Sequence, residues 1–184
     1  MFGKGLVLFS LALALCLGAR TINAQEFTAK CVGVTDGDTI TVLVGLEQMK
    51  IRLEGIDTPE AGQDFATKAK KFTSGFVFGK HVHILPKERD RYGRLVARVK
   101  VDNTDVSLEL AKAGLAWHYK KYSSDPKLAA AEQQARTEGI GVWSLPDPRP
   151  PWDHRMVSRR PIIIRRVLGS ILRLQRVIEE EKGK

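Results

Sequence analysis

The sequence predicts an α+β fold: a five-stranded Greek-key β-barrel of the OB type with about three helices, an N-terminal signal peptide and a basic C-terminal tail. Apolar residues make up 43% of the 184-residue chain, which is enough for a packed core. The expected order is three strands, one helix, two strands and two helices. A single helix between the third and fourth strands is typical of such a barrel. Long helix–strand crossovers are missing, which disfavours a parallel sheet.

Five segments have the pattern of short strands. The segment 39–44 is β-branched and apolar and follows a Gly-Asp pair. Met49, Ile51 and Leu53 alternate with polar residues, which indicates a strand with one buried face and puts Arg52 on its other face. The predicted strands are 28–34, 39–44, 49–53, 82–84 and 95–101.

Three segments are expected to be helical. The first lies between Gly62 and Gly79, where Phe65, Ala69, Phe72 and Phe76 recur at helical spacing. The second covers residues 108–113 and ends at Gly114. The third begins at Asp125 and Pro126, which form a cap and first-turn pair, and it ends near Gly139.

The first 24 residues have the layout of a secretory signal peptide. Lys4 precedes an apolar run over residues 6–17, and cleavage is expected after Ala24. The run is shorter than the roughly 20 residues that a membrane-spanning helix needs, and an uncleaved membrane anchor is the alternative. We therefore expect a secreted or periplasmic protein. Only Cys31 would remain after cleavage, so no internal disulfide is expected. We expect Cys31 to be a small buried residue of a strand.

Basic residues are concentrated near the C-terminus. The chain has 30 Lys and Arg against 21 Asp and Glu, a net charge of +9, which suggests a polyanionic partner. Prolines cluster in residues 145–155, so the domain is expected to span 25–155 and a basic tail 156–184. The apolar and basic residues of the tail approximate an amphipathic helix that contacts an anionic membrane or nucleic acid. A helix packed on the barrel and a disordered basic end are the alternatives.

Acidic and basic residues gather in three stretches at expected strand ends: 36–39, 52–60 and 90–94. Clustered carboxylates suit a hard cation such as Ca²⁺, although an Asp-Gly-Asp sequence alone is also an ordinary turn. Arg52 and Arg94, together with a cation, would stabilise the charge of a phosphodiester under attack, and a remaining carboxylate could take a proton from water. For either arginine alone, a solvated strand-face charge is the simpler interpretation.

In order and spacing, these stretches resemble the signature motifs of the thermonuclease, or staphylococcal-nuclease-like, family of secreted OB-fold endonucleases. The resemblance covers residues 28–150, and Val142, Trp143 and Ser144 resemble the end of that family's domain. It implies a Ca²⁺-dependent endonuclease that acts on DNA and RNA and leaves 3′-phosphate products. It implies no obligate protein partner.

The resemblance also assigns roles to individual residues. Asp38 and Asp57 would bind Ca²⁺ through carboxylates and Thr58 through its backbone carbonyl, with Asp36 in the outer shell. The catalytic residues would be Arg52 and Arg94, which grip the phosphate, and Glu60, which acts as the general base. Substrate-binding residues would be Arg91, Tyr92 and Tyr119, with Tyr122 as a further stacking surface.

Two other functions fit parts of the sequence. One is a catalytically silent OB-fold module that only binds nucleic acid. The other is a membrane-surface interaction protein in which the tail matters more than the barrel. Glu60, Arg52 and Arg94 are all present, which favours the enzyme.

Overall fold

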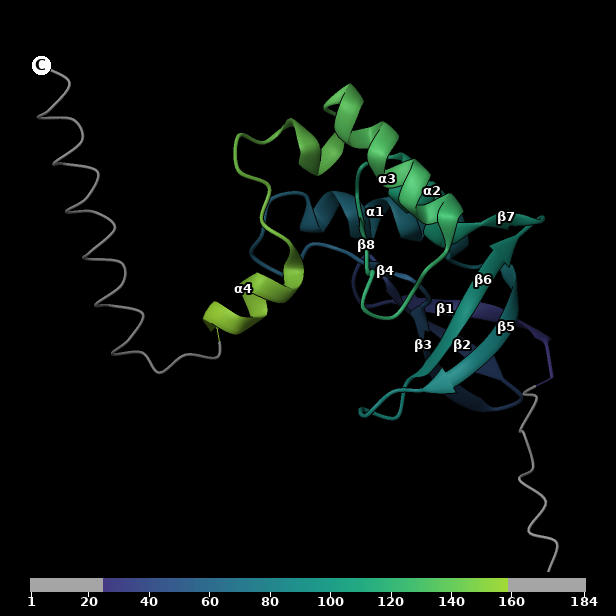
Figure 1. The fold of residues 1–184 in the computed structure, drawn as a ribbon. Coiled ribbons are helices and arrows are strands. Elements are labelled where there is room, and N and C mark those ends of the chain that lie inside the picture. Colours follow the sequence, from purple (N-terminus) through teal and green to yellow (C-terminus); the bar gives the residue numbers. More distant parts are fainter. Residues whose placement is uncertain (1–24, 159–184) are drawn as a thin grey trace, which may run out of the picture.

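The computed structural model describes residues 25–158 (Figure 1). The predicted signal peptide and nearly all of the predicted amphipathic tail lie outside these residues. Within them, no helix combines the length and the apolar character needed to cross a membrane.

Five strands form the predicted closed barrel. They are β1 (Phe27–Val34), β2 (Thr39–Val44), β3 (Glu47–Leu53), β5 (His81–Arg89) and β6 (Leu95–Val101). The neighbouring strands run antiparallel in the order β3-β2-β1-β5-β6, and a parallel pairing of β3 with β6 closes the cylinder. Closure brings Arg52 of β3 opposite Val96 of β6, two residues beyond Arg94. The OB-like fold expected from the sequence is therefore confirmed.

Three two-residue strands were not predicted. β7 (Thr104–Asp105) extends the sheet beside β6, whereas β4 (Ile56–Asp57) pairs with β8 (Trp117–His118). The second pairing matters for the site, because it fixes the segment after β3 against a segment that begins 60 residues later in the chain. Two-residue strands have no periodicity of their own, so only the folded arrangement reveals them.

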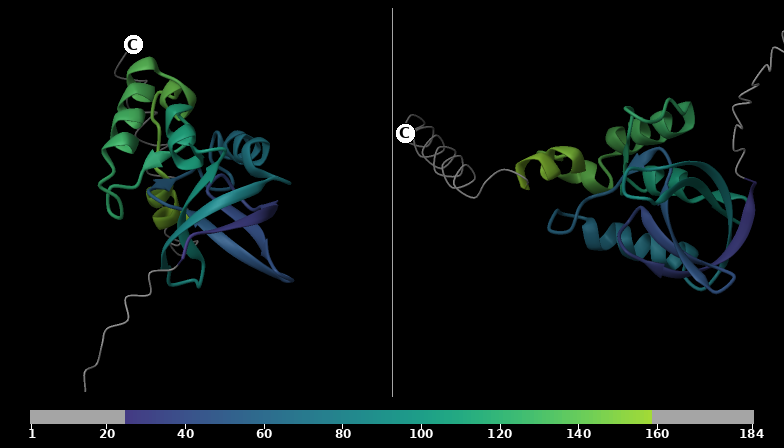
Figure 2. Two further views of the ribbon diagram at one scale, coloured as in Figure 1. Left: turned by 90° about the vertical axis from the view of Figure 1, so that its right-hand side faces the viewer. Right: turned by 90° about the horizontal axis from the view of Figure 1, so that it is seen from below.

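The helices gather on one side of the barrel (Figure 2). They are α1 (Ala66–Val77), α2 (Val106–Lys112), α3 (Pro126–Glu138) and α4 (Pro151–Ser158), with a 3₁₀ turn η1 (Gly141–Ser144) after α3. The helix expected at 108–113 begins two residues earlier, because the Asp105 side chain accepts a hydrogen bond from the Leu108 N–H and caps it. Asp125 and Gly139 cap α3 as predicted.

The proline-rich segment leads into a further helix. The expected domain boundary at residue 155 falls inside α4, which continues to Ser158. In Figure 1 the chain passes from α3 to α4, which lies to the left of the barrel strands in this view.

The core fills the barrel and the space under the helices. The inward residues of alternate strand positions are fully buried, among them Ile40, Val42, Ile51, Val82, Ile84 and Val99. Each such side chain contributes about 1.5–3 kcal/mol by leaving water. Cys31 is also fully buried, as predicted. The outward face of β3 is thereby left to present Arg52.

Candidate active site

Arg52 links two acidic side chains from different elements. It lies on β3, whereas Asp38 directly precedes β2 and Asp57 lies in β4. Its Nη1 atom is 3.1 Å from Asp38 Oδ2, and its Nη2 atom donates to Asp57 Oδ1 at 2.8 Å. The three side chains are only 12%, 7% and 2% exposed, in that order. Two residues predicted as metal ligands and one predicted to grip phosphate are therefore brought together.

Asp38 also fixes the third predicted metal ligand. Its Oδ2 atom accepts hydrogen bonds from the Thr58 backbone N–H at 2.8 Å and from the Thr58 hydroxyl at 3.0 Å. The adjacent Gly37 makes this approach sterically possible. A Cβ atom at Gly37 would lie 2.7 Å from Thr58 Oγ1 and 2.8 Å from the Ala69 side chain.

Asp36 lies behind this pair. Its Oδ1 atom accepts a hydrogen bond from the Asp38 backbone N–H at 3.1 Å. Burial, followed by the charge of Asp38, raises the pKa of Asp36 to about 6. Asp36 therefore lies next to a predicted metal ligand, and its outer-shell role stays a prediction.

Arg94 is oriented by the turn between β5 and β6. Asp90 accepts hydrogen bonds from the Arg94 backbone N–H at 2.9 Å and from its Nε at 2.7 Å. The other end of the guanidinium reaches Thr39 Oγ1 at 3.4 Å, next to Asp38. Burial acts to raise the pKa of Asp90, but these hydrogen bonds and the Arg94 charge outweigh it and lower that pKa. Arg94 thus faces the same acidic cluster as Arg52.

Arg91 and Tyr92 lie at the exposed tip of this turn. The Arg91 guanidinium is 4.9 Å from the Tyr92 ring centroid, and Tyr92 is 61% exposed. Arg94 contacts the same ring at 5.6 Å. The pair forms a solvent-facing cationic and aromatic surface beside Arg94, where a neighbouring phosphate was expected.

Tyr119 is held beside the acidic cluster by the β4–β8 pairing. Its backbone N–H donates to the Gly55 carbonyl at 2.9 Å, and its ring makes an edge contact with Tyr122 at 4.9 Å. Trp117 is buried against Trp143 and is a packing residue.

Another aromatic side chain covers one face of the Tyr119 ring, which is predicted to stack on a base. Trp152 of α4 is stacked on it, with ring centroids 5.2 Å apart and an interplanar angle of 7°.

Arg155 of α4 completes the cluster, and sequence patterns did not single it out. It donates to Asp57 Oδ1 at 3.2 Å and Oδ2 at 2.6 Å, and also to Glu60 Oε1. Burial disfavours the charged guanidinium, but Asp57 and Glu60 outweigh this effect and raise the pKa of Arg155 above its ordinary value. Arg155 lies 98 residues from Asp57 in the chain, so no local motif could have revealed the contact.

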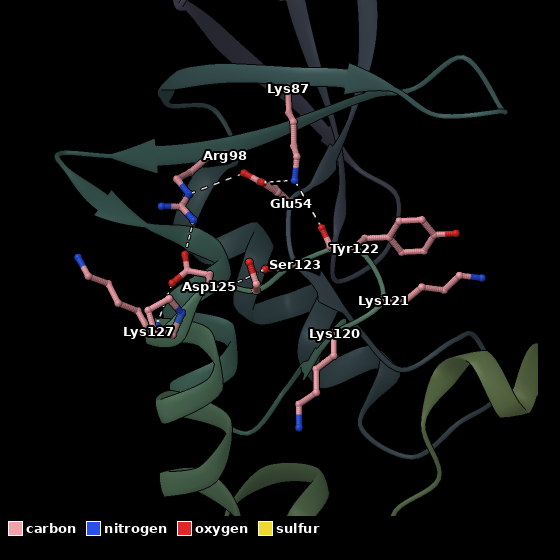
Figure 3. A pocket seen from close by; sticks show the side chains of 11 residues that line it. Glu54, Lys87, Arg98, Lys120, Lys121, Tyr122, Ser123, Asp125 and Lys127 are labelled. Carbon is pink, nitrogen blue, oxygen red and sulfur yellow. Dashed lines mark hydrogen bonds and ion pairs between the residues drawn. The ribbon is translucent and has the colours of Figure 1, made fainter.

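The described part of the chain also forms a cavity whose lining does not include the residues of the acidic cluster. This cavity of about 730 Å³ opens between β5, β6 and the loop from β8 to α3. Figure 3 shows lysines around it from both sides, including Lys87, Lys120, Lys121 and Lys127. Lys87 and Arg98 also reach toward Glu54 across the cavity, so part of its positive charge is balanced.

The predicted ligands suit a divalent cation. Among residues 25–158, no three His, Cys, Asp or Glu side chains are grouped as a metal site. The expected ligand set contains only two such side chains, the carboxylates of Asp38 and Asp57, and its third ligand is the Thr58 backbone carbonyl. All of these donors are oxygen atoms, which hard cations prefer. The donor set therefore fits the ion, although Arg52 and Arg155 form ion pairs with these carboxylates in the structure described here.

The chain is similar to known proteins. Residues 50–145 match the family model described as "Staphylococcal nuclease homologue". An "Uncharacterized endonuclease" of Haemophilus influenzae is 38% identical over 82% of this chain and 85% of its own length. A second protein of that name, from Escherichia coli O157:H7, is 36% identical over 76% and 92%. A "Micrococcal nuclease" of Shigella flexneri is 33% identical over 73% and 83%.

The matched region contains the second half of β3, Arg52 and Arg94, the acidic segment after β3 and the segment that carries Tyr119. Because the family model and these relatives cover most of the described fold, the chain belongs to the staphylococcal-nuclease-like family of nucleases.

Proposed function

We propose that the protein is a Ca²⁺-dependent endonuclease that hydrolyses phosphodiester bonds in DNA and RNA and leaves 3′-phosphate ends. Family membership makes the protein a nuclease and therefore a hydrolase. The finer proposal is carried by one observation, the convergence of Arg52 and Arg94 on a cluster of oxygen ligands that suits a hard cation.

The two arginines are suited to hold a phosphate. Guanidinium groups bind phosphate oxygens through paired donors and stabilise the charge that builds up during hydrolysis. Arg52 is fixed by Asp38 and Asp57, and Arg94 by Asp90, so both are oriented before substrate arrives. A bound Ca²⁺ would add positive charge beside the same phosphate.

Glu60 is suited to activate water. Its side chain is 38% exposed, so water has access to it, whereas Asp57 is almost completely buried. In the proposed reaction the Glu60 carboxylate takes a proton from the attacking water, and the arginines hold the phosphate in place.

The lysine-lined cavity supports a substrate longer than a dinucleotide. The Lys120 side chain is 71% exposed and that of Lys87 is 44% exposed. Lys87 is paired with Glu54 and Lys120 with Glu132, but both remain exposed enough to contact phosphates on either side of the cleaved bond. Their contacts would be independent of base sequence, in keeping with action on both DNA and RNA.

The proposal includes export and surface binding. Residues 1–24 have the layout of a signal peptide, so we propose that the enzyme acts outside the cytoplasm. Residues 159–184 contain eight basic and three acidic residues, which favours contact with anionic lipid or nucleic acid.

Digestion of plasmid DNA and of RNA tests the proposal. Both are expected to be cleaved with Ca²⁺ and to remain intact in excess chelator, and end-group analysis should find 3′-phosphates. Arg94→Ala should abolish most of the activity, whereas Arg89→Ala, an exposed arginine of the same hairpin, is the matched control. Nucleic-acid binding without cleavage would contradict the proposal and support the silent binding module.

A further inference from the structure

Helix α4 covers two parts of the candidate active site at once. Trp152 stacks on Tyr119, and Arg155, three residues later, binds Asp57 and Glu60. Residues three apart lie on one helix face, so a single short helix presents both side chains. We propose that α4 is an intramolecular competitor that excludes the metal ion and the nucleic acid until it is displaced. This inference rests on the proposed function for its biological meaning, but its central test does not depend on catalysis.

The first competition is for Asp57. Both oxygens of this carboxylate accept hydrogen bonds from Arg155, and Oδ1 also accepts one from Arg52. A divalent cation bound to Asp57 would face the Arg155 guanidinium at close range, beside a carboxylate that is only 2% exposed. Like charges repel strongly in such surroundings. Arg155 and the metal ion therefore occupy Asp57 alternately.

The same arginine also blocks the proposed base. Its Nη1 atom donates to Glu60 Oε1, so Glu60 forms an ion pair while α4 is in place. While α4 is in place, this oxygen is occupied by the guanidinium and is not free to accept a proton from water. Arg155 thus neutralises both acids that the proposed reaction needs.

The second competition is for Tyr119. Trp152 lies nearly parallel to its ring, and Tyr122 meets it edge-on. A nucleobase that stacks on the covered face must first move Trp152 away. The indole therefore holds the place that a base would take in the nucleic-acid complex.

A tether keeps α4 near the site. Gln63 accepts a hydrogen bond from the Glu60 backbone N–H at 2.9 Å and donates to the Arg149 carbonyl at 3.0 Å. The segment that enters α4 is thereby fastened to the loop that carries Glu60. Displacement of α4 then requires movement only of the residues after Arg149.

The test is Ca²⁺ binding to the full-length, metal-free protein, measured by calorimetry. Arg155→Ala should bind Ca²⁺ about tenfold more tightly or better, because the competing state is removed. Arg149→Ala is the matched control, since that side chain is exposed and its ion pair is with Asp147. Arg155→Gln provides a second variant, and circular dichroism checks that each variant is folded.

Tryptophan fluorescence gives an independent readout. Saturating Ca²⁺ should change the emission of the parent protein as Trp152 leaves Tyr119, and Trp152→Phe should lack this change. Activity measured at limiting Ca²⁺ should rise in Arg155→Ala.

The outcomes separate the competing explanations. Unchanged or weaker Ca²⁺ binding by folded Arg155→Ala and Arg155→Gln would overturn the inference. If activity also fell, Arg155 would instead be a substrate contact. Tighter Ca²⁺ binding in a protein that cuts no nucleic acid would support the competition while refuting the proposed nuclease specificity. If the parent cleaves nucleic acid but the Arg155 variants bind Ca²⁺ as the parent does, the competition is refuted and the proposed nuclease function is not.

Discussion

Glu60 differs from the other two acids of the cluster in its contact with water. Its side chain is 38% exposed, whereas those of Asp38 and Asp57 are 7% and 2% exposed. A general base must reach the attacking water, and metal ligands need not. Glu60→Gln should therefore keep the fold and the bound metal and lower kcat by about 10²-fold or more. Steady-state cleavage of a short oligonucleotide measures the effect.

Asp64→Asn is the control for this substitution, because Asp64 is exposed in the same loop. It should cleave at the parent rate. If Glu60→Gln also cleaves at the parent rate, Glu60 is not the base.

Arg94 depends on Asp90 for its orientation. Asp90 accepts hydrogen bonds from both the Nε and the backbone N–H of Arg94. Arg94→Ala should lower kcat by about 10²–10³-fold, the usual cost of losing a charge-stabilising donor. Asp90→Asn should cost less, because the guanidinium charge stays while its orientation is weakened. Single-turnover cleavage rates of both variants measure these losses. If Arg94→Ala cleaves at the parent rate, Arg94 does not stabilise the charge on the phosphate.

At the scale of elements, α3 is joined to the barrel through its N-cap residue, Asp125. The Asp125 side chain caps the helix by accepting from the Lys127 N–H at 2.9 Å and also forms an ion pair with Arg98 of β6. Asp125→Ala should lower the free energy of unfolding by about 0.5–2 kcal/mol, the usual cost of losing a cap. Urea denaturation at neutral pH measures it, with the exposed Asp153→Ala of α4 as a control.

The same carboxylate makes the loss dependent on pH. Burial acts to raise the pKa of Asp125, but the Lys127 N–H and Arg98 outweigh it and lower that pKa below 3.8. The stabilisation is therefore complete above pH 3.8 and is lost as the pH falls through the lower folded-state pKa. The difference between the parent and Asp125→Ala should shrink below pH 3.8. A difference that stays constant into strong acid would contradict the assignment.

Two glycines with the same backbone conformation separate strain from steric clash. Gly114 and Gly139 both have φ of +63°, but only at Gly114 would a Cβ atom meet a neighbour, the Ile140 carbonyl oxygen at 2.3 Å. Ala at either position bears the cost of a left-handed conformation, about 1–2 kcal/mol. Gly114→Ala should be destabilised further, because α2 and η1 must move apart. Equal melting temperatures for the two variants would contradict this contact.

The elements that the sequence predicted well have strong local signals. The alternating apolar residues of β2 and β6 and the caps of α3 identify those elements to the residue. β5 is longer than the expected 82–84, because its polar end continues to pair with β6 through Glu88 and Arg89, which are exposed. The short β4 and β8 were missed, because their hydrogen bonds depend on segments far apart in sequence.

At the scale of the molecule, some residues of the candidate site could be predicted from local sequence and others could not. Asp38, Arg52 and Arg94 lie in compact motifs, and barrel closure brings these motifs together. Arg155 and Trp152 lie at the end of the proline-rich segment, in a sequence with no recognisable motif, and their contacts arise only from the packing of α4. Contacts of this kind have no periodicity or spacing from which they could be predicted.

Basic residues are concentrated at the C-terminal end of the chain, so we expect this segment to bind polyanions. Residues 159–184 contribute eight basic and three acidic residues, whereas every predicted catalytic residue lies upstream. Truncation after Ser158 keeps α4 and should leave the fold and the cleavage of a short oligonucleotide unchanged. Binding to long DNA and to anionic vesicles should weaken.

That weakening should diminish as salt is added, because ionic attraction is screened over about 8–10 Å near physiological ionic strength. A full-length variant with Arg165, Arg166, Arg173 and Arg176 replaced by Gln separates charge from chain length. If charge is responsible, this variant should bind long DNA and vesicles as weakly as the truncated protein does. If the truncated protein is folded but fails to cleave the short substrate, residues 159–184 belong to the catalytic domain and the boundary drawn from the sequence is wrong.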